Sequence, residues 1–270
     1  MWDGLSTVGA LVRADHPWSD AQLASLYDAF SFDADLPLYL ELASAEGGRV
    51  LEVACGSGRV LVPLARAGHR IVGIDSSPPM LALAREKLDA DPETLARARL
   101  VQADMRTFDV RDQAPFDVAI VAVKSFAYLT ERADQLACLR RIAEHLRPRG
   151  VLSIDFLHPR PEWVAAASGS VRDDLLQQSQ GVTVSRVESV VSTDLARQVR
   201  VIRSAYEIID DRGALVTKRF VEWPYRWTYR FEAEHLLERA GFEIAAVYGD
   251  YARTELTAES TSMVFLARRL

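Results

Sequence analysis

The stretch VLEVACGSGRV, Val50 to Val60, decides how the chain is interpreted. A mostly apolar run that carries one acid, Glu52, ends at the small residues Cys55–Gly58, and a helical pattern follows. This pattern is typical of a buried parallel strand that leads into a helix. Gly56 and Gly58 remove side chains where a ligand could touch the backbone and the N–H groups of the next helix. A phosphate, a nucleoside or merely a tight strand-to-helix connection could each explain the turn.

Strands and helices alternate around this stretch. Two N-terminal helices are predicted, at about residues 20–28 and within DLPLYLELASAEGG, which ends at Gly47 and Gly48. Alternation of mostly apolar runs with helical patterns implies right-handed crossovers and an α/β, doubly wound, mostly parallel sheet. The predicted strands are residues 49–54, 70–75, 99–103, 116–123 and 151–157, and the predicted helices are residues 59–67, 78–88 and 132–146.

The pattern changes after His158. The β-rich runs VTVSRVESVVSTD, QVRVIRSAYEIID and ALVTKRFVEWPYRWTYRF, with the turn signal DDRG between two of them, predict an antiparallel sheet. A helix at residues 232–240 and two final strands then return to the α/β pattern. We therefore predict a seven-stranded ligand-binding core with an N-terminal helical lid, residues 1–157 and 231–270, and an inserted antiparallel β cap for the substrate, residues 158–230.

Ligands of doubly wound sheets bind at the carboxyl ends of the strands. Leu61 stands where the dinucleotide fingerprint has its third glycine, which disfavours a pyrophosphate loop. Asp75 ends the second strand, and each carboxylate oxygen can accept one hydroxyl of a ribose. Asp104 follows the third strand and could accept from an exocyclic amine, while Met105 could pack against a base. Buried Glu52 needs a donor, such as a bound amino group. Together these features favour a nucleoside ligand with a polar tail.

Four motifs in this order resemble those of the class I S-adenosyl-L-methionine (SAM) dependent methyltransferases, whose fold is Rossmann-like. They cover about residues 27–156 and read LEVACGSGR, GIDSSPPMLALAREKL, LVQADMRTF and LRRIAEHLRPRGVLSIDF. The segment FDVAIVAVKSFAYL further resembles small-molecule enzymes of the glycine N-methyltransferase and amino-sugar dimethyltransferase kind, which carry a β-rich cap. Lys124 and Tyr128 replace the usual asparagine and histidine of that segment, which speaks against glycine as the substrate.

The resemblance implies a SAM site, with S-adenosyl-L-homocysteine as the product. Gly56 and Gly58 would pass under the methionine moiety, and Ala54 would lend its carbonyl oxygen to the amino group. The other implied contacts lie at the ribose, the adenine, the methionine end and the lid: Asp75, Ser76, Met80, Asp104, Met105, Ala122, Tyr27 and Tyr39. Simpler explanations stay open: Asp75 could be a helix N-cap, Asp104 an exposed strand-end acid, and the two tyrosines core aromatics.

The residues that act on the acceptor are less constrained by these patterns. His158 follows the fifth parallel strand and is the predicted catalytic base. Lys124, Tyr128 and Arg226 are the predicted substrate-binding residues, although Lys124 could instead be a solvated charge. Alternation within WPYRWTYRF predicts one strand face, which either packs or forms a pocket wall, made of Trp223, Tyr225, Trp227 and Tyr229.

These observations predict methyl transfer from SAM to a small molecule by in-line displacement, for which the enzyme supplies positioning. An amine nitrogen is favoured as the acceptor by analogy with the resembling enzymes. O-methylation of a hydroxyl or carboxyl group, a SAM-binding protein without turnover, and an NAD-linked oxidoreductase are the alternatives.

Composition bounds the remaining possibilities. The 270 residues are 49% hydrophobic and 26% charged, with a formal net charge of −6 and no basic runs, which argues against a nucleic-acid partner. Cys55 and Cys138 lack metal-ligand spacing and suggest a reducing compartment. The N-terminus lacks a signal-peptide pattern, and no run approaches the ~20 apolar residues of a membrane helix. We therefore expect a cytoplasmic protein with no metal and no membrane partner, which could form a homodimer.

Overall fold

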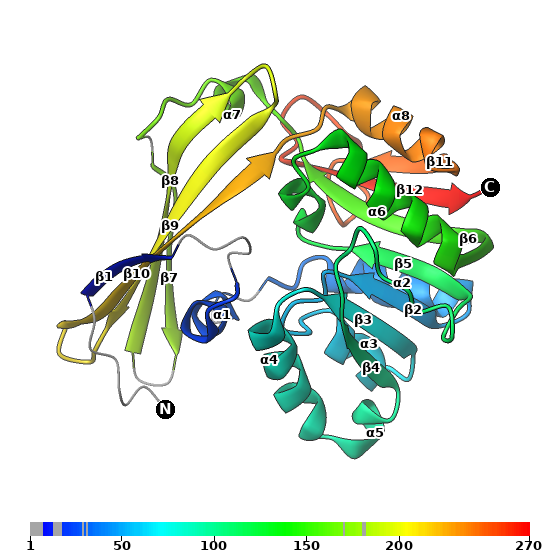
Figure 1. The fold of residues 1–270 in the computed structure, drawn as a ribbon, viewed down its shortest axis with the longest axis horizontal. Helices are drawn as coiled ribbons and strands as arrows, with labels where there is room; N and C mark the ends of the chain where they lie inside the picture. The colour runs from blue at the N-terminus through cyan, green and yellow to red at the C-terminus, as the bar shows by residue number, and fades with distance from the viewer. Residues whose placement is uncertain (1–7, 13–17, 29, 31, 170, 180–181) are drawn as a thin grey trace. The chain divides into compact units, whose positions relative to one another are not determined.

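The computed structural model describes residues 8–12, 18–28, 30, 32–169, 171–179 and 182–270 (Figure 1). Within these residues the chain separates into two compact units. The core unit comprises Phe32–Pro161 and Trp227–Leu270, and the second unit comprises Met1–Ser31 and Glu162–Arg226. None of the described helices is both long and apolar enough to cross a membrane.

The described strands of the core unit form one sheet of seven, which we call the core sheet, in the order β11-β12-β6-β5-β2-β3-β4. The neighbours from β6 to β4 pair in parallel, whereas β12 and β11 run antiparallel. This arrangement confirms the predicted doubly wound, mostly parallel fold. The strands are β2 (Arg49–Val53), β3 (Arg70–Asp75), β4 (Ala98–Gln102), β5 (Phe116–Val121), β6 (Leu146–Leu157), β11 (Phe242–Tyr248) and β12 (Ser262–Arg269).

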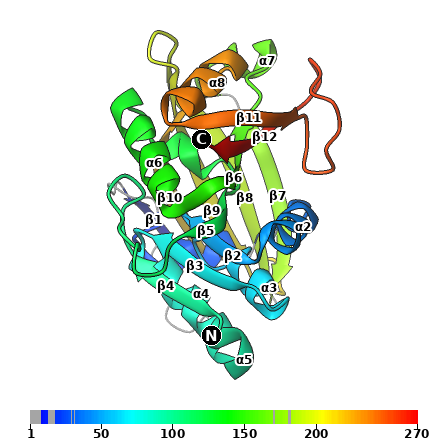
Figure 2. The same ribbon diagram turned by 90° about the vertical axis from the view of Figure 1, so that its right-hand side faces the viewer.

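Helices cover both faces of the core sheet. Figure 2 shows α6 on one side of the sheet and α2 and α3 on the other. One apolar cluster joins the sheet to α6 and α8, and another joins it to α2 and α3. Strands buried on both faces must be apolar throughout, as the sequence predicts. The helices are α2 (Leu36–Glu46), α3 (Leu61–Arg66), α4 (Pro78–Asp89), α5 (Pro92–Leu95), the 3₁₀ helix η1 (Ser125–Tyr128), α6 (Arg132–His145) and α8 (Arg230–Arg239).

The second unit contains a five-stranded sheet of described residues, which we call the second sheet, in the order β1-β10-β9-β8-β7. Strands β8 to β10 pair antiparallel, as predicted, β7 adds to β8 in antiparallel, and β1 adds to β10 in parallel. The elements of this unit are β1 (Val8–Val12), α1 (Ala21–Asp28), α7 (Pro161–Val164), β7 (Val171–Ser179), β8 (Val182–Asp194), β9 (Val199–Ile209) and β10 (Leu215–Arg226). The first residue of α7, Pro161, is the last residue of a core-unit segment.

Several elements differ from the sequence-based expectations. Strands β1 and β7 were not predicted, and β5 ends at Val121 because Val123 and Lys124 adopt positive φ angles of 53° and 59°. Helix α1 belongs to the second unit, whereas the sequence analysis assigned residues 1–157 to the core.

The single aromatic strand face predicted from WPYRWTYRF is wrong. Strand β10 ends at Arg226, so Trp227 and Tyr229 lie outside it. Trp227 is 2% exposed and belongs to the core unit, while Tyr229 is the N-cap of α8 and is 46% exposed. Period-two alternation therefore continued in the sequence beyond the point where the strand stopped.

Candidate functional site

The glycine turn after β2 combines an open position with a packed one. Ala54, Gly56 and Gly58 have φ angles of 60°, 53° and 78°. A Cβ atom on Gly56 would meet no described atom within 4 Å, whereas one on Gly58 would lie 3.1 Å from the Ala84 Cβ atom. Gly58 is therefore also needed for packing against α4, while Gly56 leaves bare backbone that a ligand can approach.

Asp75, at the carboxyl end of β3, ties the glycine turn to the next helix. Its Oδ2 atom accepts the Gly56 N–H at 2.8 Å and its Oδ1 atom accepts the Ser77 N–H at 2.8 Å. Ser77, not Asp75, is the N-cap of α4, because its Oγ atom accepts the Met80 N–H at 3.3 Å. A carboxylate oxygen can accept more than one hydrogen bond, so these two backbone contacts are compatible with a hydroxyl donor from a ligand. The side chain of Met80 is buried, and Ser76 is exposed.

Asp104, after β4, is held by an arginine that the sequence analysis did not consider. The guanidinium of Arg106 donates to both carboxylate oxygens of Asp104, at 2.6 and 3.0 Å, and also reaches Asp134 at 3.1 Å. Hydrogen bonding to Asp104 raises the pKa of Arg106. The half-buried Asp104 carboxylate is thus fixed in place, and Met105 beside it packs against the core.

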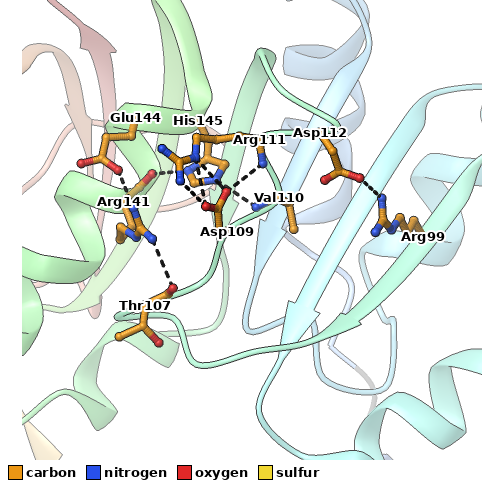
Figure 3. A network of polar contacts seen from close by, with 9 residues as sticks. All are labelled: Arg99, Thr107, Asp109, Val110, Arg111, Asp112, Arg141, Glu144 and His145. Atoms are coloured by element: carbon orange, nitrogen blue, oxygen red, sulfur yellow. Dashed lines mark hydrogen bonds and ion pairs between the residues drawn. The ribbon is translucent and has the colours of Figure 1, made fainter.

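A second network secures the loop that follows (Figure 3). His145 is fully buried, its Nε2 atom accepts the Val110 N–H at 3.1 Å, and its Nδ1 atom lies 2.7 Å from the Arg141 carbonyl oxygen. Because a carbonyl only accepts, the hydrogen is on Nδ1. Arg141 also donates to the Thr107 carbonyl oxygen at 3.3 Å. Both nitrogens of His145 are therefore in structural use, and the network positions the loop after Asp104.

Glu52 is a buried acid with an unsatisfied oxygen. It is 2% exposed, and among the described residues its Oε2 atom has no hydrogen-bond partner. Burial raises its pKa to about 8, although the guanidinium of Arg59 opposes the shift. Arg59 itself pairs in a fork with the fully buried Asp35, at 2.6 and 2.7 Å. A ligand cation at this end of the sheet would satisfy Glu52 and favour its ionised form.

Asp155 clamps Lys124 beyond the end of β5. Its Oδ1 atom accepts the Lys124 backbone N–H at 3.0 Å, and its Oδ2 atom lies 3.3 Å from the Lys124 Nζ atom. The same Oδ2 atom accepts the Tyr251 hydroxyl at 2.6 Å. Burial, followed by the Asp155 charge, raises the pKa of Tyr251, so this phenol stays a neutral donor. This arrangement holds the strained backbone of Lys124 and aims its ammonium group.

Aromatic rings adjoin this clamp. Tyr251 packs edge-on against Tyr39 at 6.5 Å and Phe32 at 5.7 Å between ring centroids, and its ring lies 6.0 Å from the Lys124 Nζ atom. Tyr39 is 1% exposed, and burial raises its pKa. Tyr39 therefore contributes to the wall behind Lys124 and is also a core aromatic residue.

His158 directly follows β6. Its Nδ1 atom lies 2.9 Å from the Ser260 carbonyl oxygen, and its backbone N–H donates to the Thr261 carbonyl oxygen. The ring hydrogen is therefore on Nδ1, which leaves the lone pair on Nε2. His158 has the tautomer that a proton acceptor requires.

The structure gathers most of the predicted site residues at the carboxyl ends of neighbouring parallel strands, in the order β6-β5-β2-β3-β4. These are Ala54, Gly56, Gly58, Asp75, Ser76, Met80, Asp104, Met105, Ala122, Lys124, Tyr128 and His158. Ala122 is buried, and its carbonyl oxygen accepts the Ser125 hydroxyl at 2.7 Å. Tyr128 ends η1 and is half-buried.

Two predicted site residues belong to the second unit. Tyr27, on α1, stacks on Trp18 with centroids 4.4 Å apart, and Arg226 ends β10. The sequence analysis also missed four residues of the core-unit site. Asp155 could have been found in the sequence, because it is an acid within an apolar strand, as Glu52 is. Arg59, Asp35 and Tyr251 give no such sequence signal, because their partners are distant in the chain.

Comparisons with known proteins agree with this geometry. The profile of a methyltransferase domain matches residues 50–150. The cypemycin N-terminal methyltransferase of a Streptomyces species is 31% identical over 83% of this chain and 84% of that protein. The dTDP-3-amino-3,6-dideoxy-alpha-D-glucopyranose N,N-dimethyltransferase of Streptomyces fradiae is 32% identical over 57% of this chain and 55% of that protein.

A solved structure shows the same fold. The CcbJ methyltransferase from Streptomyces caelestis superposes with a TM-score of 0.75 at 23% identity, over 95% of this chain and 99% of that one. The bare backbone at Gly56, the acid at the end of β3 and the unsatisfied Glu52 oxygen fit a ligand that carries a ribose and a cation. The extent of identity to the cypemycin enzyme shows the family: the chain belongs to the class I SAM-dependent methyltransferases.

Proposed function

We propose that this enzyme methylates an amine nitrogen of a small molecule. SAM, when bound, supplies a methyl group on a sulfonium leaving group. The observation that carries the proposal is the set of buried acids at the carboxyl ends of the parallel strands, Glu52, Asp75 and Asp155, which favours cationic groups there. The names of the two relatives above, both N-methyltransferases, support nitrogen as the acceptor atom.

The predicted cofactor-binding residues would contact different parts of SAM. Ala54, Gly56 and Gly58 would lie along the cofactor's methionine moiety, and Asp75 would hold its ribose. Glu52 would face a cationic group of the bound cofactor. Ser76, Met80, Asp104 and Met105 would surround the adenine, Ala122 would contact the methionine end, and Tyr27 and Tyr39 would close over it. Positioning of this kind is the enzyme's principal contribution to such a displacement.

The acceptor must present a neutral nitrogen, because a protonated amine has no lone pair. We propose that the Nε2 atom of His158 accepts the proton that the nitrogen gives up, since the Ser260 carbonyl holds the hydrogen on Nδ1. Lys124, held by Asp155, and Tyr128 would contact other parts of the acceptor. Arg226 would do so from the second unit, which we propose to be the substrate cap.

The experiment is a turnover assay with matched acceptors. Amines and the alcohols or phenols of the same skeleton are incubated with SAM, and products are identified by mass spectrometry. We expect methylation at nitrogen together with S-adenosyl-L-homocysteine. Methylation of the oxygen compounds alone would establish an O-methyltransferase, and SAM binding without any product would indicate a binding protein.

Lys124→Ala separates acceptor binding from cofactor binding in the same assay. We expect KM for the acceptor to rise at least about fivefold with the SAM Kd within about twofold, because the ammonium group faces the acceptor. The matched control is Lys218→Ala, a lysine of β10 that pairs with Glu207 and should leave both constants within about twofold. A larger effect of Lys124→Ala on SAM affinity would place Lys124 in the cofactor site.

We also propose a cytoplasmic location and a homodimeric assembly. Cys55 and Cys138 are both buried and free of disulfides. This state fits the proposed cytoplasmic location, where thiols are kept reduced. A homodimer is proposed without a defined interface.

A further inference from the structure

One cross-strand row of the second sheet brings two arginines and a tyrosine together. Tyr206 on β9 is the register partner of Arg186 on β8 and of Arg219 on β10. Side chains in register on neighbouring strands lie on the same face of a sheet. Two guanidinium groups therefore flank one phenol, within a single compact unit.

Each member of this row has an unsatisfied polar atom. Considering the described residues, the Arg186 Nε, Tyr206 Oη and Arg219 Nε atoms are buried and have no hydrogen-bond partner. Buried polar atoms in folded proteins are nearly always paired, so three in one row require an explanation. Tyr206 is fully buried, and burial raises its pKa against a smaller opposing effect of Arg186. The phenol is thus a neutral group that can donate a hydrogen bond.

The surroundings of the row leave it positively charged. Glu188 forms an ion pair with Arg186, because its Oε1 atom lies 3.9 Å from the Arg186 Nε atom. This distance is beyond that of a hydrogen bond, and the same Oε1 atom accepts the Ser204 hydroxyl at 2.9 Å. Arg219 donates one Nη2 hydrogen to the Gln22 side chain at 2.5 Å. Phe30 lies 5.1 Å from the Arg186 guanidinium and covers its face without accepting a hydrogen bond at its edges. One acid thus adjoins two cations.

Two other cations of the same sheet are partnered by carboxylates through direct hydrogen bonds. Arg203 on β9 donates to Glu222, its register partner on β10, and Lys218 donates to Glu207. These pairs occupy the opposite face of the sheet, since strand neighbours alternate. On this face, in contrast, Glu188 lies only at ion-pair distance from Arg186, and Arg219 donates to an uncharged glutamine.

We propose that Arg186, Tyr206 and Arg219 form a binding site for an oxyanion, either a carboxylate or a phosphate group. Two guanidinium groups and a phenol match the acceptor oxygens of such a group, and arginine forks recognise planar or tetrahedral oxyanions. The site gives the methyl acceptor a chemical class, an amine that also carries an acidic group. This last step rests on the proposed function, whereas the anion site itself does not.

The test is isothermal titration of the full chain with inorganic phosphate and, separately, with acetate. Both are measured at constant ionic strength with saturating S-adenosyl-L-homocysteine, which fills the cofactor site. Binding of acetate alone identifies a carboxylate site, binding of phosphate alone identifies a phosphate site, and binding of both supports the shared oxyanion chemistry. Binding of neither anion to the wild-type chain overturns the proposal.

Variants locate the site. Arg186→Gln and Arg219→Gln are each expected to raise the anion Kd at least about tenfold, since each removes a charge-assisted donor. Tyr206→Phe should raise it about threefold, because a neutral donor contributes less. The matched control is Arg203→Gln, which removes one arginine from the other face and should leave the anion Kd within about twofold. Equal losses in Arg203→Gln and Arg186→Gln would overturn the proposal.

The cofactor titration keeps the two proposals apart. Wild type and variants are titrated with SAM, which also checks that each variant is folded. Should Arg186→Gln fail this check, Arg186→Lys keeps the charge without the fork and should weaken anion binding by a smaller factor. Amines with and without a carboxylate or phosphate are then compared as acceptors. A lower KM for the acidic member that disappears in Arg219→Gln would link the site to catalysis, while anion binding without any methyl transfer would count against the proposed function only.

Discussion

At the scale of single residues, the site depends on carboxyl groups that share one end of a sheet but have different environments. Asp75 accepts two backbone N–H groups, Asp155 accepts a phenol and lies beside an ammonium group, and Glu52 is buried with one oxygen unsatisfied. These environments make Asp75 and Asp155 structural anchors. Burial raises the pKa of Glu52 towards neutrality.

Asp75→Ala tests the ribose contact. We expect the SAM Kd to rise more than about tenfold, because charge-assisted hydrogen bonds are lost together with the tie between Gly56 and Ser77. Isothermal titration measures the change. Asp112→Ala, which removes an acid paired with Arg99, is the control and should leave the Kd unchanged. An unchanged Kd in Asp75→Ala would place the ribose elsewhere.

Glu52→Gln tests the raised pKa of this buried acid. Burial raises the pKa of Glu52 from 4.5 to about 8, so the folded state holds the proton more tightly than the unfolded state. The resulting stabilisation is fully present below pH 4.5 and is lost as the pH rises through 8, by up to roughly 4 kcal/mol.

Chemical unfolding of the ligand-free enzyme between pH 5 and 9 measures this loss. Relative to Glu52→Gln, the wild type should lose free energy of unfolding as the pH rises. Glu41→Gln is the control, because Glu41 is 61% exposed and pairs with Arg253. Parallel pH curves for wild type and Glu52→Gln would show that the Glu52 pKa is ordinary.

At the scale of elements, β3 is shaped to lie close under the turn that follows β2. A Cβ atom on Gly73 would lie 2.4 Å from the Leu61 Cδ1 atom and 2.8 Å from the Cys55 Sγ atom. Gly73 therefore lets the start of α3 settle onto the sheet, which sets the position of Gly56 and Gly58. The need for glycine here comes from contact between elements and not from the backbone conformation.

Gly73→Ala should destabilise the enzyme by about 1–3 kcal/mol, because the added methyl group overpacks a buried contact. Thermal and chemical unfolding measure the loss. The double variant Gly73→Ala with Leu61→Ala provides the control: removing the obstructing side chain should make the second substitution's effect non-additive. Additive losses in the double variant would mean that Leu61 is not the obstacle.

At the scale of the whole molecule, the cofactor contacts predicted from the sequence are distributed over both units. The core unit carries most of the predicted contacts, and α1 of the second unit carries Tyr27. Hydrogen exchange with and without SAM tests this distribution. At a SAM concentration of about one hundred times Kd, core amides that exchange only through global unfolding should exchange about 100-fold more slowly. The reason is that the ligand binds only the folded state.

We expect additional protection at residues 54–58, at residues 75–80 and in α1. Residues 242–246 of β11, at the other edge of the core sheet, are the internal control. Protection of the core turns without α1 would remove Tyr27 from the cofactor site, and no protection at residues 54–58 would contradict the cofactor site as a whole.

The apolar strands, the glycine turn at residues 55–58 and the acids at the strand ends were sufficient to predict the doubly wound sheet and its ligand-binding end. They succeed because hydrophobic periodicity and turn chemistry are local properties. Local patterns gave a wrong prediction at WPYRWTYRF, where the alternation of residues continues after β10 has ended. They also gave no signal for β1 and β7, which are strands because a neighbouring strand pairs with each of them.

Contacts between distant segments could not be inferred in this way. Arg59 meets Asp35, Tyr251 meets Asp155, and Tyr206 lies beside Arg186 and Arg219. Folding brings these residues together across 24, 96, 20 and 13 positions of the chain. The amino-acid pattern alone predicted the family of fold, which the structure confirms, and the edge of the sheet at which we propose that the cofactor binds. Only the tertiary structure decided which acids are paired, which acid keeps an unsatisfied oxygen, and which arginines form the proposed anion site. Burial and charge pairing depend on neighbours in space, so they are properties of the packed chain.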